Sequence, residues 1–122
     1  MPVRIRDKIS DSIDITTVVG GTVYIGPYGG YGNDYLFEAW IDLSPLQSGD
    51  VLIVDLQLSS DDFNTVKSFG PVEYIGPVED QMLHIASMLI PADIKVRIAL
   101  TQTTGTARSL NVRPIIQTLE VL

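Results

Sequence analysis

The alternation of apolar and polar side chains along short runs is the feature that most constrains the fold of this chain. In DVLIVDLQLS (50–59), one face of an extended chain carries Leu52, Val54, Leu56 and Leu58. In DIKVRIALTQ (93–102), one face carries Ile94, Val96, Ile98 and Leu100. A period of two is typical of a half-buried β-strand, so both segments are predicted strands with a core face and a solvent face.

Similar patterns predict further strands along most of the chain. They cover residues 35–43, 13–19, 21–25, 63–69, 72–75 and 107–122. Pro114 interrupts the last of these and marks an edge or a bulge, because proline has no N–H to donate to a ladder. Compact polar turns at 44–50, 90–93 and 103–109 separate the runs.

These elements predict an all-β fold, a jelly-roll-like antiparallel β-sandwich of about eight to ten strands. We expect one domain over residues 1–122. Residues 1–10 form a predicted N-terminal arm that pairs with or lies on a sheet edge, of its own sheet or of a neighbouring subunit.

The tetrapeptide YIGP occurs twice, at 24–27 and at 74–77, and suggests an internal repeat. After each copy come an acid, an apolar stretch that ends near a proline, a second acid and an alternating strand. YIGP itself is interpreted as a structural joint, because glycine permits unusual dihedral angles and proline stops pairing.

The repeat bears on residues 81–90, for which the local signals conflict. Pro77, Glu79 and Asp80 resemble a helix start, and Val78, Met82, Ile85 and Leu89 recur at helical spacing. The counterpart of this segment, 35–43, is a predicted strand. The repeat favours a strand, and a helix remains the alternative.

The charge distribution bears on the choice of partner. The net charge is −7, and three of the eight basic residues lie in the first eight positions: Arg4, Arg6 and Lys8. An acidic chain without a basic stripe predicts no nucleic-acid partner. A basic N-terminal segment on an otherwise acidic chain would give electrostatic fields of opposite sign on two faces of the subunit. Such a subunit suits head-to-tail association into a homo-oligomer. No apolar run is long enough for a membrane span or a signal peptide, so we expect no membrane partner and, outside a virion, a cytoplasmic location.

No set of residues specifies catalysis. Cysteine is absent, so no thiol site can be built, and His84, the only histidine, lies in an apolar strand and is interpreted as a strand residue rather than part of a triad. The glycine-rich loop 26–34 lacks the lysine of a phosphate loop, and Asp61 and Asp62 are interpreted as a solvated turn rather than a calcium site. We therefore predict no enzymatic activity, no cofactor and no bound metal.

Several residues are candidates for contact with a partner. Loop 26–35 combines tyrosines with glycines, a composition typical of adaptable binding surfaces, although its tyrosines also suit covering the end of a core. Trp40, Val51 and Ile53 occupy the outward faces of predicted strands. The predicted interface or recognition residues are Tyr28, Tyr31, Tyr35, Trp40, Val51, Ile53, Arg4 and Arg6.

The segment VRIALTQTTGTARSLNVR (96–113), together with residues 39–58, resembles the small all-β head-accessory and decoration proteins of viruses and phages. The resemblance implies a non-enzymatic jelly-roll-like module, a capsid decoration or minor head protein of a virion. Its implied partners are copies of itself and a capsid or other virion protein. The alternative function is a carbohydrate-binding β-sandwich that uses loop 26–35.

Overall fold

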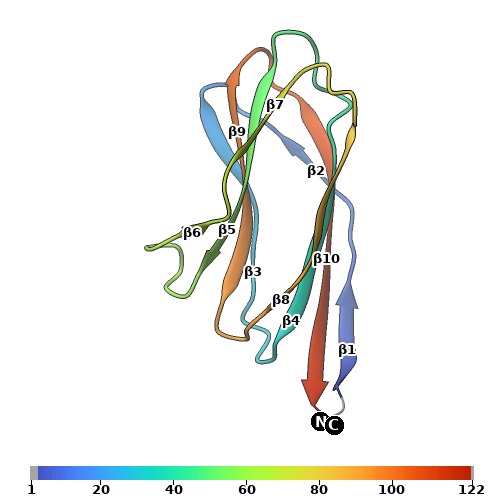
Figure 1. The fold of residues 1–122 in the computed structure, drawn as a ribbon, viewed down its shortest axis with the longest axis vertical. Helices are drawn as coiled ribbons and strands as arrows, with labels where there is room; N and C mark the ends of the chain where they lie inside the picture. The colour runs from blue at the N-terminus through green and yellow to red at the C-terminus, as the bar shows by residue number, and fades with distance from the viewer. Residues whose placement is uncertain (1–2, 122) are drawn as a thin grey trace.

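A computed structural model of the chain describes residues 3–121; Met1, Pro2 and Leu122 lie outside the described residues. Within this range the chain forms ten β-strands and no helix (Figure 1), which confirms the all-β prediction. The strands are β1 (Val3–Ile9), β2 (Ile13–Thr16), β3 (Gly21–Tyr28), β4 (Tyr35–Asp42), β5 (Val51–Ser59), β6 (Lys67–Ser68), β7 (Val72–Ile75), β8 (Met82–Ile90), β9 (Lys95–Thr104) and β10 (Ser109–Val121). Because the described chain contains no helix, it contains none long and apolar enough to cross a bilayer.

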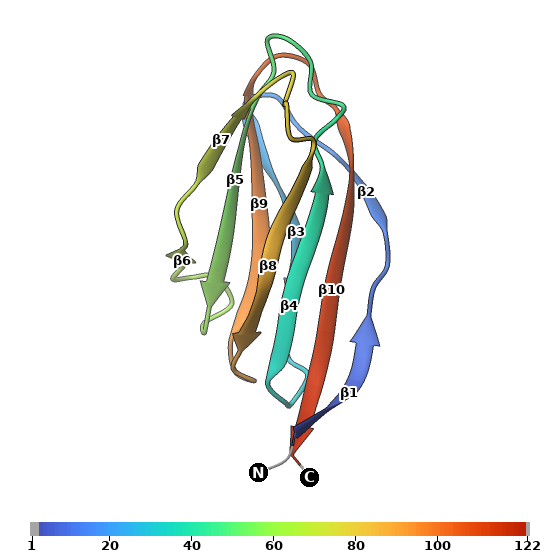
Figure 2. The same cartoon turned by 45° about the vertical axis from the view of Figure 1, so that its right-hand side comes forward.

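Two antiparallel sheets pack face to face as a sandwich (Figures 1 and 2). Sheet A has the order β1-β10-β4-β8, with β2 also paired to β10; sheet B has the order β3-β9-β5-β6, with β7 also paired to β5. When β1 and β2 count as one strand, and β6 and β7 as another, the first strand pairs with the last, the second with the last but one, and so on inward. This nested pairing, rolled into two sheets, is the jelly-roll topology and confirms the predicted fold.

β10 is an interior strand of sheet A, so Pro114, predicted to mark an edge or a bulge, does not lie on an edge strand. β4 pairs with one side of β10, from Val112 to Thr118. On the other side, β2 pairs with 109–112 and β1 pairs with 116–121. Pro114 lies opposite the break between β2 and β1. A residue without an N–H costs no hydrogen bond on that side, because no strand pairs with it there.

The N-terminal segment forms β1 and pairs with β10 of its own chain. The register runs from Val3 opposite Val121 to Ile9 opposite Ile116, with a shift between Ile5 and Asp7. All seven residues of β1 are exposed. β1 therefore extends sheet A at its edge, beside the last strand of the chain (Figure 2).

The corresponding segments of the internal repeat are both strands and are neighbours in space. β4 pairs with β8, and β5 pairs with β9. The strand prediction for 81–90 is confirmed and the helical alternative is wrong. β8 contains a bulge, because Ala39 pairs with Ile85 and Phe37 with Met88. The extra residue breaks the period of two, so that apolar residues fall three apart as they do in a helix.

The core lies between the inner faces of the sheets. Alternate residues of β4 in sheet A are wholly buried. So are the alternate residues Val96, Ile98 and Leu100 of β9 in sheet B. The largest buried side chains are Tyr35, Phe37, Ile25, Ile41, Leu43, Leu46, Leu52, Ile90, Ile98, Leu100, Leu110 and Ile116. Leu56 and Leu58, predicted on the same core face as Leu52, are only half-buried because their end of β5 faces the open side between the sheets.

Three predicted strands have clearly different bounds in the structure, and the first of them, predicted over 13–19, ends at Thr16. Of the predicted strand 63–69, only Lys67 and Ser68 pair, with Leu58 and Gln57 of β5. Asp62 and Phe63 have φ values of 56° and 64°, which belong to a turn rather than a strand. β3 continues past the predicted end at Ile25 to Tyr28, with a register irregularity between the two. The first YIGP is thus an irregularity within a strand, whereas the second spans the end of β7, with Tyr74 and Ile75 in the strand.

Candidate protein-interaction surface

The tyrosines of loop 26–35 contact the core. Tyr35 is 0% exposed, and its hydroxyl donates to the Ile94 carbonyl at 2.6 Å. The ring of Tyr31 stands edge-on to Tyr35 with centroids 5.1 Å apart, and the ring of Tyr28 lies 5.9 Å from that of Phe37. Desolvation by burial raises the pKa of all three phenols.

The burial of Tyr35 does not suit the predicted contact with a partner and fits the alternative, that the tyrosines of this loop cover the end of the core. Tyr35 is the first of the inward-facing positions of β4, so its side chain fills the end of the sandwich. Tyr28 and Tyr31 are half-buried and support it. These contacts favour the interpretation that the tyrosines cover the core, and nothing in them favours carbohydrate binding.

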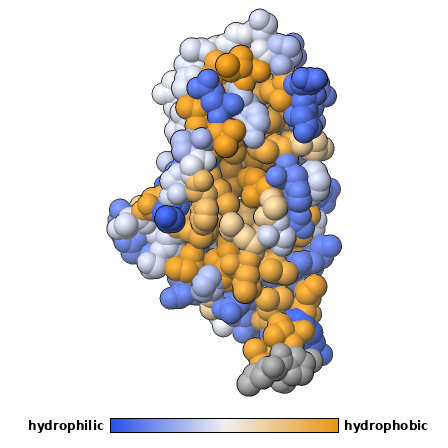
Figure 3. Space-filling model, viewed as in Figure 1, coloured by the Kyte–Doolittle hydropathy of each residue, from blue (hydrophilic) through white to orange (hydrophobic). Residues whose placement is uncertain are grey.

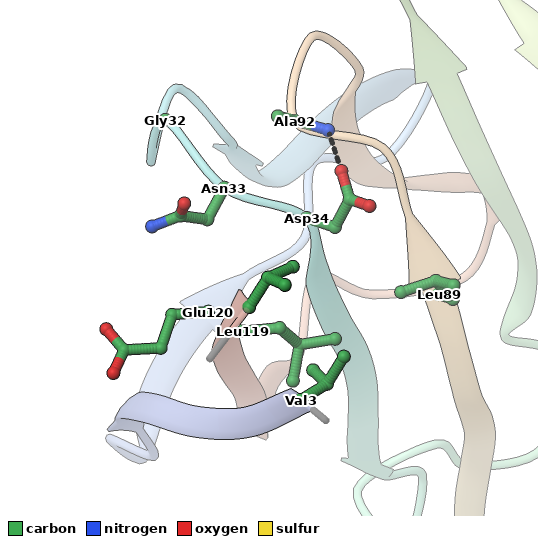
Figure 4. A pocket seen from close by; sticks show the side chains of 9 residues that line it. Val3, Gly32, Asn33, Asp34, Leu89, Ala92, Leu119 and Glu120 are labelled. Carbon is green, nitrogen blue, oxygen red and sulfur yellow. Dashed lines mark hydrogen bonds between the residues drawn. The ribbon is translucent and has the colours of Figure 1, made fainter. Parts of the chain in front are cut away.

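A shallow pocket of about 330 Å³ lies beside this loop, at the end of sheet A where β1 and β10 meet (Figure 4). Asp34 fixes one wall, because its carboxylate accepts a hydrogen bond from the Ala92 N–H at 2.9 Å and its carbonyl accepts one from the Leu119 N–H at 2.9 Å. The pocket is lined by Val3, Gly32, Asn33, Asp34, Leu89, Ala92, Leu119, Glu120 and Val121.

Apolar side chains at and beside this pocket form what we call the terminal patch: Val3, Leu89 and Val121, which are exposed, the half-buried Leu119, and the exposed Ile5 opposite Leu119. Val3 and Ile5 pair with Val121 and Leu119 across β1 and β10, so these four side chains share the outer face of the sheet. The exposed fraction is 53% for Val3, 51% for Ile5, 62% for Leu89 and 62% for Val121. Sequence patterns did not single out this patch, because it combines both ends of the chain with β8.

The predicted contact residues Arg4 and Arg6 lie on β1 next to the terminal patch. Arg4 pairs with Glu120 across the strands. The Arg6 guanidinium is 3.9 Å from the Asp7 carboxylate, and its side chain is 55% exposed. Arg4 and Arg6 thus add charge beside the patch.

Trp40 lies on the outer face of sheet A and is 37% exposed, as the alternation of β4 predicts. Its ring stacks on the ring of His84 with centroids 3.9 Å apart and an angle of 14° between the planes. His84 in turn lies 2.7 Å from the Glu38 carboxylate, between Nε2 and Oε2. The histidine is thus a strand residue with local partners, and it covers one face of the tryptophan.

Val51 and Ile53 lie on the outer face of sheet B, because they alternate with the buried Leu52 and Val54. The predicted face assignment of these residues is correct. Both side chains are half-buried, since β5 has neighbours on both sides: Ile53 is flanked by Thr101 and Glu73. They are less accessible than the terminal patch.

A buried polar group that the sequence patterns missed holds two turns together at the opposite end of the sandwich. Asp50 is 1% exposed and accepts hydrogen bonds from the Gln47 N–H at 2.8 Å, the Thr106 N–H at 2.9 Å and Arg108 Nε at 2.7 Å. These bonds, led by that from Arg108, lower the pKa of Asp50 to about 2. Every oxygen has a partner, so the group is structural.

An apolar groove follows the open side of the sandwich between β8 and the strands β5 to β7. Figure 3 shows apolar surface running down the middle of this side. Three hollows lie along this groove. The first, of about 340 Å³, is lined by Met82, the second, of about 120 Å³, by Leu83 and Ile85, and the third, of about 450 Å³, by Ile94. Leu56 and Leu58 line the opposite wall.

No family model matches the chain, and no curated protein matches it. Among solved structures, it is similar to a chain in the structure of the infectious bursal disease virus Gx strain, with 12% sequence identity and a TM-score of 0.44 over 98% of this chain. This chain spans about a third (32%) of the length of that one. At this level of similarity, the fold description rests on the strand pairing given above.

Proposed function

We propose that this protein is a non-enzymatic structural protein of a virion, a capsid decoration or minor head protein, that assembles through protein–protein contacts. The fold is compatible with this role, because jelly rolls form viral capsid domains as well as lectin domains and cupins. The resemblance of residues 39–58 and 96–113 to head-accessory and decoration proteins supports the first of these roles.

The observation that carries the proposal is the terminal patch. Four of its five side chains are more than half exposed, and four of the five line one pocket. Soluble proteins seldom leave contiguous apolar surface uncovered, and a patch with a charged rim marks a contact with another protein. Arg4 with Glu120, Arg6 with Asp7, and Lys8 supply a rim with charges of both signs, which suits a partner surface of complementary charge.

The virion assignment is tested by purifying particles from the native source on a density gradient and searching them for the chain by mass spectrometry. We expect the chain in the particle band, at a constant ratio to the other particle proteins. Recovery of the chain only from the soluble fraction would contradict the proposal.

The role of the terminal patch is tested with the variant Ile5→Asp. Ile5 is half exposed at a sheet edge, so the fold is expected to persist, whereas a buried charge at the contact weakens binding by about tenfold or more. The measurement is co-sedimentation of purified chain with particles from which the chain has been stripped. The matched control is Ile75→Asp, at a 62% exposed isoleucine on β7 in the other sheet. Equal binding by the two variants would exclude the terminal patch as the contact surface.

A further inference from the structure

The sheet edges formed by the described residues differ in how well they are protected against pairing with another chain. Edge strands present unpaired N–H and C=O groups, and proteins usually protect them with charges, proline or short length. β1 carries Arg4, Arg6 and Lys8, and β3 contains Pro27. β6 and β7 have only two and four residues. β8 has nine residues, MLHIASMLI, without a charge or a proline, and one of its sides is free.

β8 also has a pattern that matches its own reverse. Counting outward from the junction between Ala86 and Ser87, both directions give an exposed residue, an inward residue, an exposed residue and an inward residue. The inward residues are Leu83 and Ile85 on one side of the junction and Met88 and Ile90 on the other. The bulge produces this symmetry, because both Ala86 and Ser87 lie opposite Glu38 and are exposed.

We infer that β8 pairs antiparallel with β8 of a second copy of this chain, about a two-fold axis between Ala86 and Ser87. The inference rests on the proposed function, whose self-association it specifies. An isologous contact requires a surface that complements itself under a two-fold rotation, and the pattern of β8 meets this requirement. Residues that face each other in an antiparallel pair lie on the same face of the sheet. Leu83 therefore faces the partner's Ile90, and Ile85 faces the partner's Met88.

Bulges often interrupt pairing at a sheet edge. In β8 the bulge lies at the two-fold axis, so the regular segments 82–85 and 88–90 on either side supply the ladder bonds to the second copy. The smallest side chains of the strand, Ala86 and Ser87, lie where the two copies approach most closely. No rearrangement of the chain is needed, because β8 is already extended and unpaired on that side.

The second copy also covers the apolar groove. When sheet A continues across the axis into the partner's sheet A, the inward side chains of the partner's β8 enter the open side above Leu56 and Leu58. The uncharged strand opposes no like charges when it meets itself. β1, by contrast, carries Arg4, Arg6 and Lys8 and meets its own copy with repulsion.

The net charge of each copy gives the contact a characteristic salt dependence. Each chain carries −7, so two copies repel each other at low ionic strength, and salt screens this repulsion. The dimer is expected to strengthen as salt is added. A contact with a basic partner segment in the groove would weaken instead.

The experiment is sedimentation velocity of the purified chain over a range of micromolar concentrations. It compares the wild type with two variants that place charges of opposite sign at Ser87. We expect the wild type to dimerise, and Ser87→Lys or Ser87→Glu alone to weaken dimerisation at least tenfold, because each places like charges next to the two-fold axis. A one-to-one mixture of the two variants should regain the dimer. Ser48→Lys, at an exposed loop residue, is the control for added charge and should dimerise as the wild type does.

Restoration in the mixture distinguishes a lost contact from a misfolded variant, because two misfolded chains do not restore each other. A monomeric wild type at all concentrations overturns the inference, as does a dimer that Ser87→Lys leaves unchanged. Neither result affects the virion proposal, which depends on particle fractions and on the terminal patch. Absence from particles together with a dimer sensitive to Ser87 would overturn the virion role and keep the β8 contact.

Discussion

Replacing Asp50 by alanine is expected to lower the free energy of unfolding by roughly 1–3 kcal/mol, because it leaves three part-buried hydrogen-bond donors without their acceptor. The Arg108 guanidinium, whose side chain is 28% exposed, and the N–H groups of Gln47 and Thr106 lose their acceptor. Urea denaturation measures the loss. Asp11→Ala, at an exposed carboxylate in the loop after β1, is the control and should change stability by less than about 0.5 kcal/mol.

The same carboxylate makes stability depend on pH in a defined window. Its pKa falls from 3.8 to about 2 in the folded chain, chiefly through the hydrogen bond from Arg108. A group whose folded pKa is depressed contributes its full stabilisation above the unfolded pKa and loses it as pH falls through the folded pKa. The wild type should therefore lose stability from about pH 4 down to about pH 2 more steeply than Asp50→Ala. Parallel curves for the two proteins would mean that Asp50 is not the group responsible.

The second large effect concerns two neighbours on opposite faces of β5. Leu52 is 0% exposed between the sheets, so Leu52→Ala is expected to cost roughly 2–5 kcal/mol through lost burial and the cavity left behind. Ile53 is half-buried on the outer face of sheet B, so Ile53→Ala is expected to cost about 1 kcal/mol or less in the isolated subunit. Chemical denaturation of both variants compares the two faces directly. Equal losses would contradict the inward orientation of Leu52.

Leu56→Ala provides an intermediate case on the same strand. The sequence pattern places Leu56 with Leu52 in the core, but in the monomer it lines the apolar groove. We therefore expect a cost below that of Leu52→Ala when the chain is monomeric. If β8 pairs with a second copy, the cost of Leu56→Ala should rise under conditions that favour the dimer.

The fold was predictable because its information is local and repeated. Period-two runs identify β5 and β9 directly, and the repeat of YIGP identified β8 as a strand where helical signals pointed the other way. The limits of that reasoning are also physical. The pattern at 63–69 resembled a strand, but pairing needs an adjacent partner, and only two of those residues reach β5.

The candidate site was less predictable, because it depends on which distant segments meet. Trp40 was correctly placed on an outward face, since alternation within β4 decides that. Tyr35 was assigned both to the glycine-rich loop 26–35 and to the strand 35–43, and its place in the strand, with an inward side chain, makes it a core residue. The terminal patch joins β1, β8 and β10, and the bonds of Asp50 join residues 58 positions apart. No local signal in the sequence marks either one.

The nested pairing of strands has a consequence for the kinetics of folding. The innermost pairs, β5 with β6 and β7, close short loops, whereas the pairing of Val3 with Val121 closes a loop of almost the whole chain. Closing a longer loop costs more entropy, and folds dominated by such distant pairings fold in milliseconds to seconds rather than microseconds. We expect the central hairpins to form early and β1 to join β10 last. The terminal patch, which requires that last pairing, therefore becomes available for contact only when the rest of the sandwich is complete.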